Sequence, residues 1–191
     1  VVLEDFGKRP LTSLPKPLAE CIRGANVTFY AARSLGGELG LRKPFIKLAK
    51  KYARHGHMPS INERLMEEGM SADYDEISEI SKRVHGFVAK AKKARVTSPA
   101  GSDLRVDFHP EWRWKISDGI FRTKGMWGNL PDGEVFTAAW KANGTIIAEE
   151  LGDWFSPKYG VLSKTPVTLQ VEDSRVNFSS VECTNAQLRG E

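Results

Sequence analysis

The sequence is short of the features that mark membrane, secreted and disulfide-stabilised proteins. No window of its 191 residues approaches the run of about 20 apolar residues that a membrane span needs. Val1-Val2-Leu3 is followed at once by two acidic residues, which argues against a signal peptide. The 2 cysteines, Cys21 and Cys183, lie too far apart for a disulfide framework or a metal-binding spacing. We therefore expect reduced thiols and a cytoplasmic location, with Cys21 in the core.

The common catalytic and phosphate-binding motifs are also missing. The chain has no GxSxG, CxxC or HExxH, and its glycine-rich stretch from Ser34 to Gly40 lacks both the GxGxxG spacing and a Walker lysine. A net charge of +4 is a mild excess. Its two basic clusters lie near predicted helix ends, where cations favour the helix dipole. Without a basic stripe carrying interleaved aromatic residues, we expect no nucleic-acid partner and no membrane partner.

The first half of the chain has the pattern of an α/β region with several helices. Apolar residues from Leu18 to Ile22 share a helix face that Gly24 ends, and Asn26 to Ala32 alternates as a strand does. Pro44 is suited to the first turn of a helix, and Ser60 with Glu63 forms a capping box. A long helix is expected over residues 73–94, with its core face at Ile77, Ile80, Val84, Phe87 and Ala91.

Near Arg95 the spacing at which hydrophobic residues recur changes from 3.6 residues to 2 residues, which predicts strands. Alternation continues through residues 104–116, and Asn143-Gly144 has the sequence of a hairpin turn between two strands. A further hairpin is expected over residues 167–178. The predicted fold class is therefore α/β, with an α/β domain over residues 1–94 and a mainly antiparallel β domain over residues 95–191.

One acidic residue has an unusual setting. In Gly128-Asn129-Leu130-Pro131-Asp132-Gly133-Glu134, a turn-rich loop leads Glu134 to the start of an apolar strand. Proline fixes one backbone dihedral and the glycines allow left-handed ones, so the loop can hold a carboxylate in a fixed direction. A metal ligand or a general base needs such a carboxylate. Most glutamates in turns are nevertheless simply solvated.

The other candidate residues have ordinary structural explanations. His55-Gly56-His57 resembles a metal pair, but the glycine leaves it flexible, and a loop at a helix end is the favoured interpretation. Carboxylates near turns, Asp118 and Asp132 among them, could converge on a metal, although the sequence does not show that they do. Tryptophans 112, 114, 127 and 140 could line an apolar pocket or pack within a sheet.

Several segments together resemble the metallo-aminopeptidase family of the aminopeptidase T and aminopeptidase S type. They occur in the family's order: His57-Met58-Pro59, residues 98–104, Ser117-Asp118-Gly119, residues 128–136 and residues 143–146. Members of that family remove N-terminal residues of peptides with two divalent metal ions, zinc, cobalt or manganese. The resemblance implies that Glu134 is a metal ligand and that a metal-activated water attacks the peptide. It also implies a peptide substrate, and we consider a homodimer possible.

The family's remaining ligands come later in its chain, so the present sequence resembles such an enzyme without its C-terminal part. One carboxylate cannot hold a catalytic divalent ion, because such sites need three or more ligands. We therefore expect the parent protein to be an enzyme and this chain alone to be inactive. Asp118 and Asp132 are expected to support the site from neighbouring positions.

Two alternatives stay open. Relatives of these peptidases include mononuclear iron oxygenases that act on hydroxylated pyridine rings and share the early glutamate. One glutamate with a His/Asp pair would indicate a single iron, whereas two ligand sets would indicate two metals. The other alternative is a non-catalytic binding module that uses the tryptophan-rich half.

Overall fold

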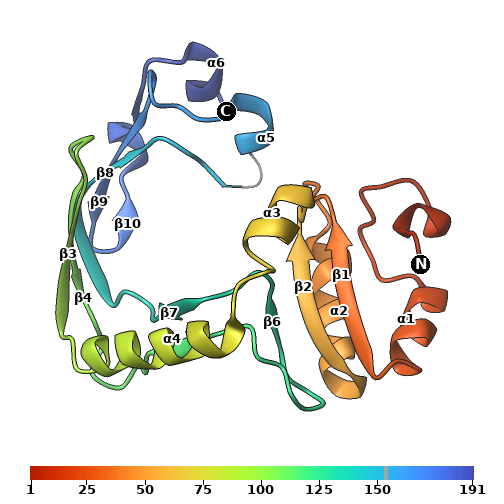
Figure 1. Ribbon diagram of the computed structural model, residues 1–191. Coiled ribbons are helices and arrows are strands. Elements are labelled where there is room, and N and C mark those ends of the chain that lie inside the picture. The colour runs from red at the N-terminus through yellow and green to blue at the C-terminus, as the bar shows by residue number, and fades with distance from the viewer. Residues whose placement is uncertain (153–154) are drawn as a thin grey trace. The chain divides into compact units, whose positions relative to one another are not determined.

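The computed structural model describes residues 1–152 and 155–191, and it confirms the predicted α/β class (Figure 1). The elements of the first half are η1 (Leu3–Phe6), α1 (Lys16–Arg23), β1 (Val27–Ala32), α2 (Leu39–Tyr52), β2 (Arg54–Pro59), α3 (Glu63–Glu68) and α4 (Tyr74–Val88). Those that follow are β3 (Lys93–Thr97), β4 (Asp103–Asp107), β5 (Lys115–Ser117), β6 (Trp127–Asn129), β7 (Glu134–Phe136), β8 (Lys141–Ala148), α5 (Ser156–Tyr159), β9 (Val167–Glu172), β10 (Arg175–Val176), η2 (Phe178–Ser180), β11 (Glu182–Cys183) and α6 (Ala186–Arg189). Among the described residues, no helix combines the length and the apolar character that crossing a bilayer requires.

The chain forms two compact units. The first unit comprises residues 1–85 and 116–135, and the second comprises residues 86–115 and 136–191. The segment 116–135 thus joins the first unit, although it lies beyond the boundary expected near residue 95. The division into domains 1–94 and 95–191 stays a prediction.

A parallel sheet of order β1-β2-β6 forms the centre of the first unit. Parallel strands need long crossover connections, and α2 provides the one between β1 and β2. Leu41, Phe45 and Ala49 lie on one side of α2 and pack with Ile22 of α1 and Tyr30 of β1 in the core of this unit. Figure 1 shows α2 and the orange β1 and β2 side by side. Cys21 is exposed on α1, so its predicted place in the core is wrong.

Two helix starts differ from the prediction. α2 begins at Leu39, which places Pro44 inside the helix instead of in its first turn. α3 is capped by Asn62, whose side-chain oxygen accepts from the Leu65 amide at 2.9 Å, so Ser60 and Glu63 form no capping box. Ser60 has a positive φ of 58°, and its amide donates to the Ala32 carbonyl at the end of β1 at 2.7 Å.

Helix α4 ends at Val88, and Ala94, which we placed in the same helix, lies in β3. Its apolar stripe is not a core face: Ile80, Val84 and Phe87 are 39%, 42% and 85% exposed. Ser78 and Ser81 are buried instead, and Ser78 donates to the Asp118 carboxylate at 2.7 Å. The helix therefore contacts the segment 116–135 through Ser78, and Tyr74 and Ile77 lie next to Gly119 and Gly133 of that segment.

The second unit contains an antiparallel sheet of order β10-β9-β8-β4-β3, with β11 also paired to β9. β8 runs without a turn through Asn143-Gly144, so the predicted hairpin at this dipeptide is wrong. Asn143 pairs with Arg105 of β4, and Gly144 pairs with Leu104 of β4 and Val171 of β9. A β-carbon built at Gly144 would lie 2.1 Å from the Asp103 carbonyl oxygen, at a φ of 134°. Gly144 is needed here for close strand contact and not for a turn.

Candidate functional site

The candidate site lies at the carboxyl end of the parallel sheet of the first unit. β6 pairs with β2 in the register His57–Asn129, and the Leu130 amide then donates to the His57 carbonyl at 2.9 Å. The chain continues from that point into the loop that carries Glu134. Ser60 joins β2 to β1 at the same edge, since its hydroxyl accepts from the Ser34 amide at 3.0 Å. Open α/β sheets bind ligands outside the carboxyl ends of their strands.

The loop 128–134 is supported on several sides. One Asp132 carboxylate oxygen accepts from the Ser117 hydroxyl at 2.6 Å, and the other accepts from the Gly133 amide at 2.9 Å. A β-carbon built at Gly128 would lie 2.7 Å from the Phe121 ring, and one at Gly69, the residue that ends α3, would lie 2.7 Å from Pro131. Close packing therefore fixes the loop's path from both ends.

Glu134 is exposed and lines a shallow hollow of about 360 Å³ together with Asn129, Pro131, Asp132 and Gly133. Within the described part of the chain, its carboxylate has neither a hydrogen bond nor an ion pair. Both oxygens of Glu134 can therefore accept a ligand's proton or coordinate a cation. Its role as a metal ligand, which we predicted from the sequence, stays a prediction.

The described residues do not by themselves make a metal centre. They contain no group of three or more His, Cys, Asp or Glu side chains that could hold an ion. Asp132 is engaged as described above, and Asp118 accepts from the Ser78 hydroxyl and the Ile120 amide at 2.7 Å and 3.2 Å. A single carboxylate does not hold a catalytic metal, so the fit is partial and rests on Glu134.

His55 and His57 lie on β2, the central strand, and not in a loop at a helix end as predicted. They are 0% and 3% exposed. The Arg42 Nε–H donates to His57 Nε2 at 3.2 Å, so His57 Nδ1 carries a proton and can donate to His55 Nε2 at 3.3 Å. The Nδ1 of His55 then donates to the Thr28 carbonyl at 3.2 Å. Both rings are thus held neutral in fixed tautomers, and burial lowers the pKa of each to about 4.

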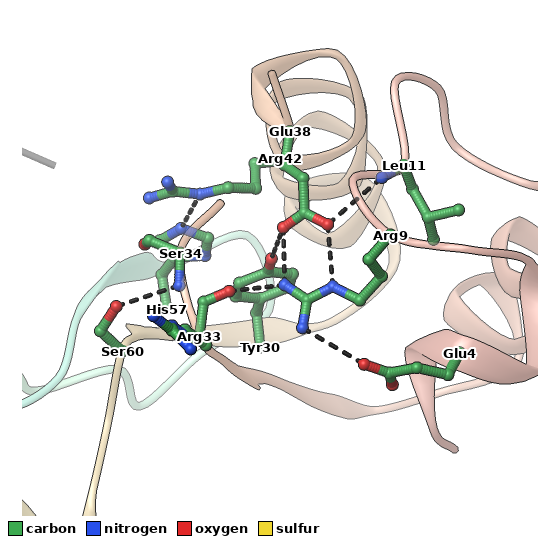
Figure 2. Close-up of polar contacts among 10 residues, drawn as sticks. All are labelled: Glu4, Arg9, Leu11, Tyr30, Arg33, Ser34, Glu38, Arg42, His57 and Ser60. Carbon is green, nitrogen blue, oxygen red and sulfur yellow. Dashed lines mark hydrogen bonds and ion pairs between the residues drawn. The ribbon is translucent and has the colours of Figure 1, made fainter. Parts of the chain in front are cut away.

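A largely buried ion pair between Arg9 and Glu38 lies close to His57, as Figure 2 shows. The Arg9 guanidinium donates to both carboxylate oxygens of Glu38 at 2.8 Å and 2.7 Å, and the Tyr30 hydroxyl donates to Glu38 at 3.3 Å. Arg9 holds the pKa of the Glu38 carboxyl below its usual range. Tyr30 also stacks on His57 with ring centroids 4.9 Å apart. Glu38 comes from the glycine-rich stretch 34–40, whose sequence gave no sign of a buried charge.

The tryptophans separate into two groups. Trp127 belongs to β6, and the Lys50 ammonium lies 5.6 Å from the centre of its ring. In the second unit, Trp112, Trp114 and Trp140 line a hollow of about 580 Å³ with residues 89–93 and 107–110. We call this the tryptophan hollow. Sequence spacing did not show that these three side chains meet, because they come from segments on both sides of the residues 116–135.

Comparison with known proteins identifies the family. The NicX family model, 2,5-dihydroxypyridine 5,6-dioxygenase, matches residues 63–184, more than half of the chain. The chain therefore belongs to this family. Its fold is similar to that of 2,5-dihydroxypyridine dioxygenase from Pseudomonas putida KT2440, with a TM-score of 0.59 and 16% identity over 91% of this chain. The match covers 48% of that protein, so the chain spans about half its length. The search of curated proteins gave no match.

These findings correct the aminopeptidase interpretation. The family is that of a ring-cleaving dioxygenase, so the proposed hydrolase activity, the proteolysis and the peptide substrate are wrong. A pair of zinc, cobalt or manganese ions has no support either. The segments that suggested the peptidases, such as residues 128–136, include the loop and the strand end that hold the candidate site. A likeness confined to such short segments does not by itself carry a reaction.

Proposed function

We propose that this chain provides the first carboxylate ligand of a mononuclear iron site in a dioxygenase that opens a hydroxylated pyridine ring. The family match over residues 63–184 carries this proposal, because that range includes the whole loop 128–134. Glu134 supports it as the loop's available carboxylate, at the strand ends where α/β sheets bind ligands.

Ligands from outside the described residues would complete the coordination of the iron. One carboxylate combined with two further ligands on the same side leaves open positions on Fe(II), as non-haem oxygenases require. In this arrangement Asp132 holds the loop in place, since its two oxygens accept hydrogen bonds from the Ser117 hydroxyl and the Gly133 amide. The hollow of about 360 Å³ is then the part of a small-molecule site that this chain contributes.

A cytoplasmic location is part of the same proposal. It rests on the 2 cysteines, which are both free, and on their distance in the sequence.

The test uses protein expressed from its complete reading frame and loaded anaerobically with Fe(II). We expect the Glu134→Gln variant to lose bound iron and to cleave 2,5-dihydroxypyridine more than about 100-fold more slowly, because losing a ligand costs more than losing a residue that only orients one. Iron is measured by a ferrozine assay, and cleavage by the loss of ring absorbance together with oxygen uptake.

Glu150→Gln is the matched control, since Glu150 is also exposed and lies outside the site. It should retain iron and activity. If Glu134→Gln keeps both, Glu134 is not a ligand. If the unaltered protein binds iron and leaves 2,5-dihydroxypyridine intact, the proposed reaction is wrong even though the metal site stands.

A further inference from the structure

The tryptophan hollow is a second concave site, and it lies wholly within the second unit. Backbone hydrogen bonds hold its walls together. The Phe108 amide donates to the Lys92 carbonyl at 2.9 Å, and the Trp140 amide donates to the Asp107 carbonyl at 2.9 Å. The ends of β3, β4 and β8 therefore meet at one rim of the sheet.

The aromatic rings in the hollow are packed against one another but remain open on one side. His109 lies 5.3 Å from Trp112 and 5.0 Å from Trp140, measured between ring centroids. Trp112 and Trp140 are still 46% and 47% exposed. Phe108 and Trp114 form an edge contact with centroids 5.0 Å apart. The Lys141 ammonium also lies 5.2 Å from the centre of the Trp140 ring. Half-exposed indoles held in place by neighbouring groups favour stacking by a flat aromatic molecule.

The charge of the lining is positive. It includes three lysines and one carboxylate, Asp107, which pairs with Lys93 at 3.4 Å. In the described part of the chain, Lys90 and Lys92 form no ion pair, so two ammonium groups have no counter-charge. His109 adds a donor: its Nδ1 accepts from the Glu111 amide at 3.2 Å, which leaves the proton on Nε2. Three donors thus border an aromatic surface.

We propose that the tryptophan hollow binds a small planar aromatic anion, such as an aromatic carboxylate. The ring stacks on Trp112 and Trp140, and the carboxylate accepts from the ammonium groups of Lys90 and Lys92. A volume of about 580 Å³ lies in the range of small-molecule pockets, which is about 300–1,000 Å³. This site is independent of Glu134 and of the proposed iron chemistry.

Titration of the 191-residue chain with three probes tests both parts of the recognition. Benzoate is aromatic and anionic, benzyl alcohol is aromatic and neutral, and cyclohexanecarboxylate is anionic without an aromatic ring. Binding is followed by the indole N–H signals in ¹H–¹⁵N spectra and by calorimetry. We expect benzoate to bind with a Kd of about 1 mM or below and to shift the signals of Trp112 and Trp140. The other two probes should bind at least about fivefold more weakly.

Two variants separate the contributions. Lys90→Gln with Lys92→Gln should weaken benzoate about five- to tenfold and leave benzyl alcohol unchanged, because only the anion loses partners. Trp140→Leu should weaken both aromatic probes about tenfold. Lys43→Gln with Lys47→Gln, exposed positions on α2, makes the same charge change elsewhere and should alter neither.

Three results would overturn the proposal. The first is the absence of benzoate binding up to 20 mM, taken as about 20 times the expected Kd. The second is equal affinity for benzoate and benzyl alcohol in the unaltered chain, which would make the hollow a plain apolar surface. The third is self-association of the chain that Trp140→Leu abolishes, which would assign this face to a second copy. Retention of benzoate binding by Glu134→Gln confirms that the site is separate from the iron proposal.

Discussion

At the residue scale, neutral histidines in the first unit are the most unusual chemical groups. His55 and His57 are buried and form a chain of hydrogen bonds. Arg42 donates to His57, His57 donates to His55, and His55 donates to the Thr28 carbonyl. Protonating either ring would put a second donor where an acceptor is required and would place a charge in the core. The nearby Arg42 guanidinium adds to this cost at His57. The pair therefore stabilises β2 only while both rings are neutral.

This arrangement predicts a pH dependence of stability. Burial lowers the pKa of each histidine from 6.5 to about 4 in the folded chain. Between those two values the unfolded chain binds more protons than the folded chain, so stability is complete above pH 6.5 and is lost as the pH falls towards 4. We expect the free energy of unfolding to fall by roughly 1 kcal/mol per pH unit for each histidine below about pH 6.

Urea unfolding at intervals between pH 5 and 7 measures this slope, in a range where carboxylates contribute little. His57→Gln should reduce the slope of the unfolding free energy against pH by about one proton. An equal slope in the His57→Gln variant would contradict the assignment of neutral tautomers.

At the element scale, β8 decides how the second unit is assembled. It pairs with β4 on one side and β9 on the other, and its Gly144 has a partner in both strands. An Asn-Gly pair is a frequent turn sequence because both residues tolerate positive φ. Here the glycine instead admits the Asp103 carbonyl, which approaches where a side chain would lie. Pairing on both sides satisfies the backbone groups of this stretch and outweighs its tendency to turn.

Substituting this glycine should be costly. Gly144→Ala combines a φ of 134° with a contact of 2.1 Å to a backbone oxygen, so the strands must separate. We expect a loss of about 3 kcal/mol or more in the free energy of unfolding, measured in urea.

Gly86→Ala is the control for this change. A β-carbon at Gly86 meets nothing within 4 Å, and the residue is inside α4, where alanine is about 0.5–1 kcal/mol better than glycine. The control should therefore raise stability slightly. A Gly144→Ala variant as stable as the unaltered chain would mean that β4 and β8 are not paired as described.

At the scale of the whole molecule, the candidate site is incomplete within the described residues. The loop 128–134 supplies a carboxylate, while the same residues contain no group of three potential ligands. The chain also spans 48% of the structurally similar dioxygenase. Under the proposed function, iron affinity would therefore depend on ligands other than this loop.

The 191-residue chain alone should therefore gain little from iron. A ligand that binds the folded state stabilises it by RT ln(1 + [L]/Kd), and this term is small here because a single carboxylate stays largely unsaturated at about 0.1 mM Fe(II). We expect a change in Tm below about 1 °C, measured anaerobically with and without a chelator. Saturable binding of one Fe(II) per chain, abolished by Glu134→Gln, would show instead that these residues suffice.

The sequence determined the local structure where the pattern was strong. Gly24 ends α1, the alternating residues 27–32 form β1, and the change of period near Arg95 marks the passage from α4 to the antiparallel pair β3–β4. The loop before Glu134 was also evident, because proline fixes one backbone dihedral and glycine allows left-handed conformations that other residues rarely adopt. Such features depend on neighbours in the sequence and so can be read from it.

Tertiary structure decided what depends on distant partners. Pairing of β2 with β6, separated by more than 65 residues, carries the Glu134 loop to the end of a parallel sheet and buries His55 and His57. Ser78 of α4 is buried where it contacts Asp118, and the apolar stripe of the helix is left exposed. Pairing with strands on both sides keeps Gly144 extended. The sequence pattern contains each of these residues, but it does not show which surfaces meet. The free energy of those contacts, and not local preference, selected the final arrangement.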